Sequence, residues 1–210
     1  MNIPLRRTLT ASLASLVVLS SCAGTKTSIP ISWRNPGYES AVFDDLLVIG
    51  VGRNEGSRRL FEDEFAKKLS AEGARAQASW ELLPDTTQLT QEQIANAVQA
   101  GSFDAVLITR LLSVDKEQEY VEGSTYSVPG NYYGSAYYGY YATSYAVVHE
   151  PGYFKTNTTF RLETNLYAVS DSGLVWSGQS DTVNPSSVAD VIDSMTTAVA
   201  NTLRQQRLIP

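Results

Sequence analysis

A continuous apolar run, Leu46-Leu47-Val48-Ile49-Gly50-Val51, constrains the fold more than any other stretch of this chain. A run of strand length without alternating polar positions is typical of a strand that is covered on both faces. The next segment has helical periodicity, and Ser57 and Gly73 suit its two ends. Its apolar side would hold Leu60, Phe61, Phe65 and Leu69, and its polar side mainly Glu62, Asp63, Lys67 and Lys68. The folded region therefore begins with a strand and a helix that packs on it.

The same alternation continues toward the middle of the chain. Ala74 to Trp80 is a weaker strand, which we expect at a sheet edge. Thr90-Gln91-Glu92-Gln93 has the form of a capping box and opens a second helix. A third strand begins at Phe103–Ile108, and the chain stays extended to about Val121. The order strand, helix, strand, helix, strand predicts right-handed crossovers and a parallel core.

The C-terminal part has a different pattern. Phe160 to Ala168 alternates apolar and polar residues, which is typical of a half-exposed antiparallel strand. Asp171-Ser172-Gly173 predicts a turn, and Leu174-Val175-Trp176 predicts the returning strand. Asn184-Pro185-Ser186 opens a last helix, whose apolar stripe is Val188, Val191, Ile192, Met195, Val199 and Leu203. We expect an α/β (α+β) fold with a mixed sheet of about five strands, in the order β-α-β-α-β-β-β-α, and three helices.

Residues 1–21 have the form of a lipoprotein signal peptide. Arg6 and Arg7 precede an apolar stretch that is too short to span a bilayer, which needs about 20 residues. Leu19-Ser20-Ser21-Cys22 matches a lipobox, which predicts cleavage between Ser21 and Cys22 and lipidation, including palmitate, on Cys22. An uncleaved apolar helix and an ordinary secretory signal are the alternatives. Ala23 stands where aspartate would retain an enterobacterial lipoprotein, so we expect the periplasmic face of a bacterial outer membrane.

Cys22 is the only cysteine, so the mature chain has neither a disulfide nor a free thiol to use. Loss of Arg6 and Arg7 with the signal leaves 14 basic against 22 acidic residues, a formal net charge of −8. This balance argues against nucleic acid as a partner and against polybasic docking on anionic lipid. We expect a lipidated N-terminus and tether over residues 22–43, and a single α/β domain over 44–205 that needs no cofactor.

A tyrosine- and glycine-rich insertion over residues 125–153 is the most distinctive part of the domain. It holds nine of the twelve tyrosines of the chain, interleaved with glycines. Tyrosine offers a large amphipathic contact area, and glycine leaves the backbone adaptable, which suits binding of an envelope protein or a glycan. The alternative is a mobile insertion that binds nothing specific. The candidate partner-binding residues are Tyr132, Tyr133, Tyr137, Tyr138, Tyr140 and Tyr141.

The other candidates for chemistry are weaker. Gly50 to Gly56 lies between a strand and a helix, where dinucleotide folds bind phosphate, and Glu81 follows the next strand. The glycine spacing is one residue too long for that fingerprint, which favours a plain tight turn. His149 beside Glu150, with Ser135 or Ser144 nearby, lies in the insertion and has no partner at fixed geometry. Glu117 and Glu119 share a strand face and give a weak indication of cation binding. We predict no catalytic residue and no metal ligand.

The arrangement resembles a small α/β domain of bacterial envelope proteins. The resemblance rests on the lipobox, on Leu47-Val48-Ile49 leading into an amphipathic helix, on Phe103-Asp104-Ala105-Val106-Leu107 after a helix, and on a hairpin with Trp176 before the last helix. The groups it resembles are the N-terminal domain of the TolB type, the lipoprotein activators of penicillin-binding proteins, and the curli-secretion lipoproteins. Uncharacterised lipoproteins with the same layout match equally well, and the resemblance assigns no functional residue.

These observations predict a membrane-anchored, non-enzymatic binding or assembly factor of the bacterial cell envelope. The first alternative is a subunit of an oligomeric envelope or secretion assembly. The second is a hydrolase of cell-wall or glycan substrates, which would need acidic groups such as Glu117 and Glu119, or His149, in a deep cleft.

Overall fold

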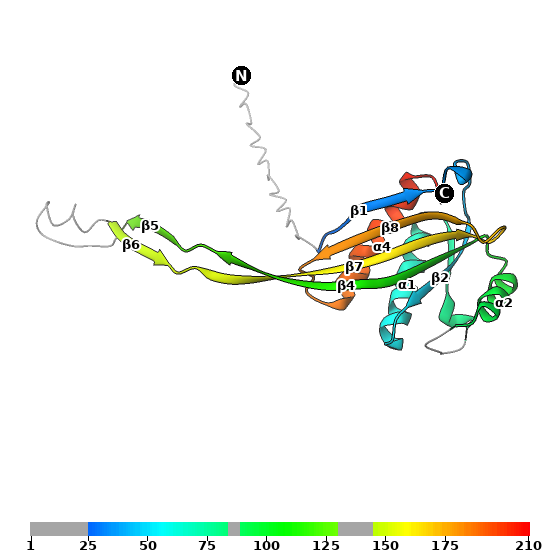
Figure 1. Cartoon of the computed structure of the whole chain (residues 1–210), viewed down its shortest axis with the longest axis horizontal. Helices are drawn as coiled ribbons and strands as arrows, with labels where there is room; N and C mark the ends of the chain where they lie inside the picture. Colours follow the sequence, from blue (N-terminus) through cyan, green and yellow to red (C-terminus); the bar gives the residue numbers. More distant parts are fainter. Residues whose placement is uncertain (1–24, 84–88, 130–144) are drawn as a thin grey trace, which may run out of the picture.

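The computed structural model describes residues 25–83, 89–129 and 145–210. This part of the chain forms a six-stranded mixed sheet of order β1-β8-β7-β4-β2-β3, a separate hairpin of β5 and β6, and three helices (Figure 1). The predicted α/β class is therefore confirmed. The sheet has one strand more than the five expected, and the hairpin is an addition.

The strands are β1 (Thr27–Arg34), β2 (Asp45–Val51), β3 (Arg75–Ala78), β4 (Ala105–Val121), β5 (Ser124–Pro129), β6 (Tyr145–Glu150), β7 (Tyr153–Ala168) and β8 (Leu174–Val183). The helices are α1 (Glu55–Ala71), α2 (Gln91–Gly101) and α4 (Val188–Gln205), and short 3-10 turns cover Pro36–Tyr38 and Ser79–Glu81. β2 pairs in parallel with β3 and with β4, as the alternation of strands and helices predicts. β4 pairs antiparallel with β7, β7 with β8, and β8 with β1.

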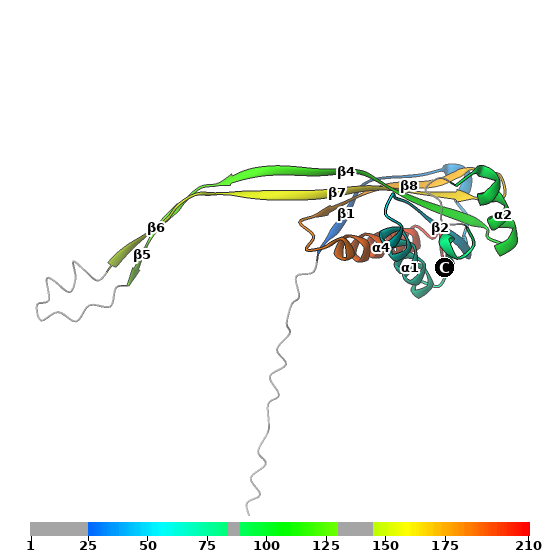
Figure 2. The same ribbon diagram turned by 90° about the horizontal axis from the view of Figure 1, so that it is seen from below.

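The helices lie on two faces of the sheet. α1 and α4 lie together on one face (Figure 2), where they bury Phe65, Leu69, Met195 and Leu203 against β2, β4, β7 and β8. α2 covers a smaller part of the other face and packs on Leu47 of β2 and Val106 of β4. β2 thus has apolar contacts on both faces, which explains its continuous apolar run.

The predicted helix ends are confirmed at two places and shifted at a third. Thr90 and Gln93 form the expected capping box of α2, and Gly73 takes a φ of +105° just after α1. Asn54 rather than Ser57 caps α1, and its side chain accepts a 2.8 Å hydrogen bond from the backbone N–H of Ser57. The helix can begin three residues earlier than expected because asparagine is as good an N-cap as serine.

The tether predicted over residues 22–43 is wrong for most of its length. Thr27–Arg34 is the edge strand β1, and Pro30 lies at the bulge between Ser28 and Ile31, where a missing N–H interrupts no ladder. After β1, the chain stays on the domain, because Tyr38 donates a 2.5 Å hydrogen bond to Asp171 and Phe43 is buried. Within the described residues, the fold therefore includes most of the segment that was expected to be a tether.

The far boundary also differs from the predicted residue 205. The chain after α4 contributes Leu208 and Ile209 to the main core, and both are almost completely buried. The backbone carbonyl of Leu208 accepts a 2.9 Å hydrogen bond from the N–H of Phe43, so the C-terminal segment is joined to the chain just before β2.

The apolar side predicted for α1 is rotated from the true one. The buried stripe is Arg58, Phe61, Glu62, Phe65, Ala66 and Leu69, with spacings of three and four residues. Leu60 falls off this stripe and is 43% exposed, whereas Glu62 lies on it and is fully buried. The side assignments of Leu60 and Glu62 were therefore wrong. The buried stripe is the side of α1 that packs on β2 and β3. The Glu62 carboxylate can lie on it because its hydrogen-bond donors are in β2 and in the turn after β3.

Candidate functional site

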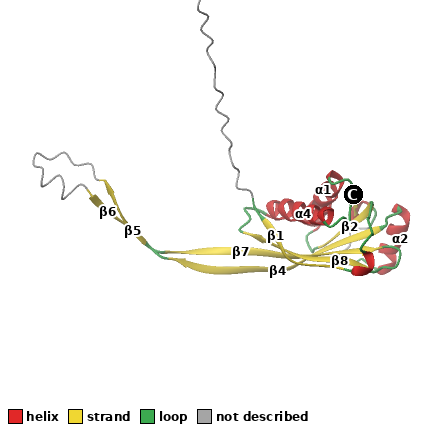
Figure 3. Ribbon diagram, turned by 90° about the horizontal axis from the view of Figure 1, so that it is seen from above, coloured by secondary structure: helices red, strands yellow, loops and turns green. Residues whose placement is uncertain are grey.

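β4 and β7 continue far beyond the sheet as a two-stranded ribbon. Their register runs without a break from Val114↔Phe160 to Val121↔Tyr153. β2 stops opposite Arg110 and β8 stops opposite Thr159, so the outer half of the ribbon pairs with no third strand among the described residues. Figures 1 and 3 show this half reaching well past the helices. The extended chain predicted as far as Val121 is confirmed.

The two faces of the ribbon differ in chemistry. The face that continues the covered side of the sheet carries two apolar pairs, Val114 with Phe160 and Tyr120 with Phe154, all partly or largely exposed. Two polar pairs, Lys116 with Thr158 and Gln118 with Thr156, lie between them. The rings of Tyr120 and Phe154 are 5.1 Å apart at their outer end, and Phe154 is 70% exposed. Aromatic surface at that level of exposure is typical of a contact site.

The opposite face carries more charged groups, and some of them bind one another. Arg161 forms an ion pair with Asp181 (2.8 Å) and a longer one with Asp115 (3.5 Å), and the Asp181 hydrogen bond raises the pKa of the guanidinium. Glu119 accepts a 3.1 Å hydrogen bond from the amide of Asn157. Glu117 and Glu119 share this face, as predicted. In the part of the chain that the structure describes, no three His, Cys, Asp or Glu residues group as metal ligands.

Two glycines form the joint between the ribbon and the β5–β6 hairpin. A Cβ on Gly123 would lie 2.4 Å from the backbone oxygen of Glu150, and one on Gly152 would lie 2.2 Å from the hydroxyl of Tyr120. The backbones therefore approach one another as only glycine permits. Figure 2 shows the hairpin turned away from the line of the ribbon at this joint.

The predicted histidine candidate lies on this hairpin. His149 shares a 2.9 Å hydrogen bond with the hydroxyl of Thr125, and Glu150 accepts bonds from Ser124 and Tyr126. His149, Glu117 and Glu119 thus lie on exposed strands of the ribbon and hairpin and line none of the cavities described below. The hydrolase alternative required these groups to lie in a deep cleft, and these three residues do not.

Several predicted site residues lie outside the described residues. They are Ser21, Cys22, Ser135, Ser144, Tyr132, Tyr133, Tyr137, Tyr138, Tyr140 and Tyr141. The structure does place the two ends of the tyrosine segment, because Pro129 at the end of β5 pairs with Tyr145 at the start of β6. The segment therefore starts and ends at the tip of the hairpin.

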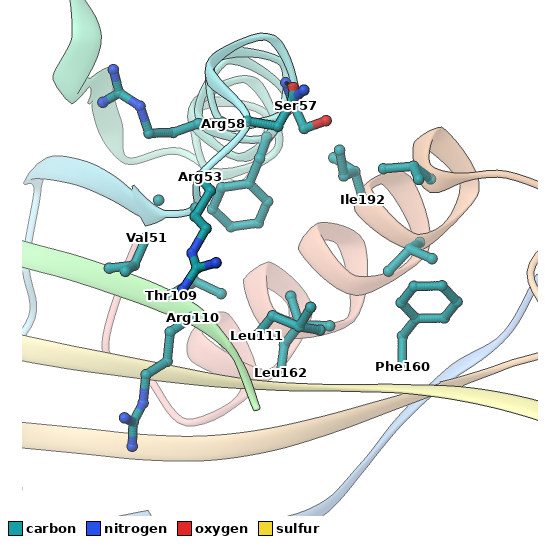
Figure 4. A pocket seen from close by; sticks show the side chains of 16 residues that line it. Val51, Arg53, Ser57, Arg58, Thr109, Arg110, Leu111, Phe160, Leu162 and Ile192 are labelled. Carbon is teal, nitrogen blue, oxygen red and sulfur yellow. Dashed lines mark hydrogen bonds between the residues drawn. The ribbon is translucent and has the colours of Figure 1, made fainter. Parts of the chain in front are cut away.

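An apolar cavity of about 270 Å³ lies at the base of the ribbon (Figure 4). It is bounded by the turn after β2, by the start of α1, by β4 and β7, and by the first turns of α4. The turn is the Gly50 to Gly56 segment singled out in the sequence. Its apolar lining includes Val51, Phe61, Leu111, Phe160, Leu162 and Ile192. Sequence reasoning missed this cavity, because its walls come from five separate elements.

Three arginines adjoin the cavity, and two of them are engaged elsewhere. Arg110 binds Glu163 at 2.8 Å on the opposite face of the sheet, and Arg58 lies 3.5 Å from Glu62. Figure 4 shows the guanidinium groups of both directed away from the cavity, whereas that of Arg53 is directed toward the β4 side. Within the described ranges, Arg53 forms no ion pair.

The turn beside the cavity is fixed by buried Glu62. Its Oε1 accepts a 2.9 Å hydrogen bond from the backbone N–H of Gly50, and its Oε2 accepts bonds from Ser79 Oγ (2.8 Å) and the N–H of Trp80 (3.0 Å). One carboxylate thus joins β2, α1 and the turn after β3. These bonds offset the large cost of burying a charge.

The first described residues are bound to α4 by a chain of hydroxyl groups. Thr182 donates to Thr27 (2.7 Å), Thr27 to Ser194 (2.8 Å), and Ser194 to the backbone carbonyl of Thr25 (2.9 Å). The chain enters the domain at the end where the ribbon leaves it (Figure 1), because Thr27 pairs with Thr182 near the end of β8. No helix in the described part of the chain has the length and apolar character needed to cross a membrane.

Comparisons with known proteins give likenesses of fold only. No family model matches the sequence, and no curated protein matches it. Among solved structures, the PelC dodecamer from Paraburkholderia phytofirmans is similar at 13% identity and a TM-score of 0.46, over 86% of this chain and 97% of that one. Lipoprotein GNA1162 from Neisseria meningitidis is similar at 14% identity and a TM-score of 0.37, over 76% and 97%. At these values the likeness carries no argument about activity or partners.

Proposed function

We propose that this protein is a lipid-anchored, non-enzymatic assembly factor of the bacterial envelope that binds its partner through the β4–β7 ribbon. The main support for this proposal is the structure of the ribbon. A two-stranded ribbon alone is only marginally stable in water, and stability normally requires a third strand or packing on another element. The outer half of this ribbon nevertheless presents Tyr120 and Phe154 to solvent. A partner that covers this face would supply the missing packing.

The position of the tyrosine segment supports the same proposal. The ribbon and hairpin hold the ends of the segment far from the helices, at the point most accessible to another molecule (Figure 1). The glycine joint sets the direction in which the hairpin leaves the ribbon. We therefore keep Tyr132, Tyr133, Tyr137, Tyr138, Tyr140 and Tyr141 as candidate contacts to an envelope protein or a glycan.

The anchor in this proposal is a lipid on Cys22, on the periplasmic face of the outer membrane. It is supported by the lipobox and by Ala23 after the cysteine. Stable anchoring takes at least two acyl chains. Globomycin, which blocks the lipoprotein signal peptidase, should cause the precursor to accumulate. If globomycin did not change processing of the precursor, the lipid anchor would be contradicted. The proposal that the ribbon binds the partner would not be affected, because it is tested separately.

The ribbon is tested by shortening it. A variant in which residues 119–155 are replaced by a two-residue turn keeps all the pairs between β4 and β7 that adjoin a third strand. We expect its thermal midpoint to match that of the whole protein and its capture of cross-linked envelope partners to be lost. A second variant, Val42→Gln, at a 51% exposed position outside the ribbon, controls for loss of exposed apolar surface in general. Equal capture by the shortened and whole proteins would show that the ribbon is not the binding element.

A second copy of the chain is the alternative partner. β1 is the outermost strand of the sheet, and its Ile31 and Trp33 are 60% and 48% exposed, so one edge is open to pairing. Light scattering of the unlipidated protein distinguishes the two cases. A defined oligomer that Trp33→Arg dissociates would favour self-assembly through this edge.

A further inference from the structure

We infer that the cavity at the base of the ribbon binds the acyl chain of an anionic amphiphile, with the acid group at Arg53. The argument for the source of this ligand rests on the proposed lipid anchor. The argument for the site itself rests on the cavity and stands without the anchor.

The lining is apolar and unusually open to water. Val51 from β2, Leu111 from β4 and Val188 from α4 face this one hollow, and each is more than half exposed. Phe160 and Leu162 of β7 form the floor and are only partly buried. Burial of apolar surface contributes about 25 cal/mol per Å², so filling the hollow with hydrocarbon is favourable. Apolar side chains from several elements that converge in this way are typical of a ligand groove.

The size of the cavity selects the ligand. Pockets for drug-sized molecules measure about 300 to 1,000 Å³, and this one, at about 270 Å³, lies just below that range. A single unbranched chain fits such a volume better than a ring system or a folded peptide segment.

Arg53 selects the charge. It lines the cavity, its guanidinium is directed toward the β4 wall (Figure 4), and no described acid pairs with it. The nearest acid in sequence, Glu55, is already bound to Arg59 at 2.5 Å. A guanidinium recognises carboxylate and phosphate by paired hydrogen bonds, so a chain with either head group meets both requirements.

The position of the cavity places it near a lipid surface. Val188, Val191 and Ile192 line the cavity, and Ser194 on the same helix binds the backbone of Thr25. A helix with its side chains is about 10–12 Å across, and the three residues from Cys22 to Thr25 span at most about 10 Å. The cavity would therefore lie within about 25 Å of a lipid on Cys22.

The test uses the mature chain from residue 22 with Cys22→Ser, so that no lipid is attached. Titration with decanoate, followed by calorimetry and by ¹H–¹⁵N spectra, should give saturable binding with shifts at Gly52 and Leu111. Val188→Trp, at a 55% exposed position, fills the cavity and should weaken binding by about tenfold, or 1.4 kcal/mol. Leu111→Gln provides a second variant if Val188→Trp lowers the thermal midpoint. Val42→Gln, at a similarly exposed position (51%) that does not line the cavity, should bind as the parent does.

Arg53→Gln tests the charge. It should weaken decanoate by about twofold to fivefold, the range of an exposed ion pair, and leave decan-1-ol unchanged. Equal loss for acid and alcohol would overturn the role of Arg53. Absence of saturable decanoate binding, or equal binding by Val188→Trp and Leu111→Gln, would overturn the site.

Vesicles of phosphatidylglycerol distinguish the two possible sources of the ligand, a membrane lipid and a free acid. Binding to vesicles that Val188→Trp abolishes assigns the site to a membrane lipid, and decanoate binding without vesicle binding assigns it to a free acid. Because this protein carries no lipid, a positive result would stand even if globomycin had no effect on processing.

Discussion

Ser194 of α4 donates a 2.9 Å hydrogen bond to the backbone carbonyl of Thr25, only three residues after Cys22. The tether expected over residues 22–43 therefore does not extend past Thr25, which is already held on the domain. If Cys22 carries the anchor, the domain lies almost directly on the membrane and its orientation is restricted. The ribbon leaves the same end of the domain, so its direction relative to the membrane is restricted too.

The Ser194 bond predicts resistance to trypsin at Lys26. Thr25 is held on α4 by Ser194, and Thr27 is held on β8 by Thr182. Trypsin needs a locally open chain to cleave the Lys26-Thr27 bond between them. Ser194→Ala should therefore increase the rate of cleavage after Lys26, measured by mass spectrometry of timed digests. Ser70→Ala, on the exposed side of α1, is the matched control. The same rate in all three proteins would show that the contact does not hold the N-terminus.

Buried Glu62 predicts a large loss of stability on substitution. Glu62→Gln replaces one acceptor oxygen by an NH₂ group that would face donors, so at least one buried bond is lost. We expect the free energy of unfolding in urea to fall by about 2–4 kcal/mol. Glu64→Gln, two residues away and bound only to exposed Lys67, should change it by less than about 0.5 kcal/mol. Similar values for the two variants would mean that the Glu62 network contributes little.

The glycine joint predicts a change of direction without a change of stability. Gly123→Ala forces the added methyl group against the backbone of Glu150, so the hairpin must move. Spin labels on β4 and on the hairpin should report a different distance distribution, with a thermal midpoint within about 2 °C of the parent. Gly52→Ala is the control, because a Cβ there meets no atom within 4 Å. An unchanged distance in Gly123→Ala would mean that the joint tolerates a side chain.

Asp171 predicts a stability that depends on acid pH. The hydroxyl of Tyr38 and then the N–H of Gly173 donate to its carboxylate, and they lower the pKa of Asp171 below 3.8. A carboxylate whose pKa is lowered by folding stabilises the protein at pH values above its pKa in the unfolded state. This stabilisation is lost as the pH falls toward its lower pKa in the folded state. The thermal midpoint should therefore decrease from about pH 5 downward, and less steeply in Asp171→Asn. Tyr38→Phe removes the larger of the two causes and leaves the Gly173 bond, so its slope should lie between those of the parent and Asp171→Asn. A parental slope in both variants would contradict the assignment.

Local sequence signals predicted those parts of the fold that depend on neighbours along the chain. The apolar run of β2, the capping box at Thr90 and the stripe of α4 are each set by periodicity or by a single turn of helix. The long extension of β4 followed in the same way from an unbroken extended pattern as far as Val121. These elements fix the class and most of the sheet.

The features that escaped prediction depend on residues far apart in sequence. Glu62 has the pattern of a surface acid until Gly50, Ser79 and Trp80 surround it with donors. β1 contains a proline and a bulge, and only β8, some 150 residues later, shows that it is a strand. The cavity has no sequence signal of its own, although the Gly50 to Gly56 turn marked one of its walls.

The pairing of Pro129 with Tyr145 makes the tip independent of the rest of the chain. Since the hairpin already brings these two residues together, lengthening the link between them costs only about 0.6 kcal/mol for each doubling. Insertions, deletions and changes of composition between these two residues should therefore leave the core unchanged. If the ribbon and hairpin bind a partner as proposed, the residues that contact it could be exchanged while the same fold is retained.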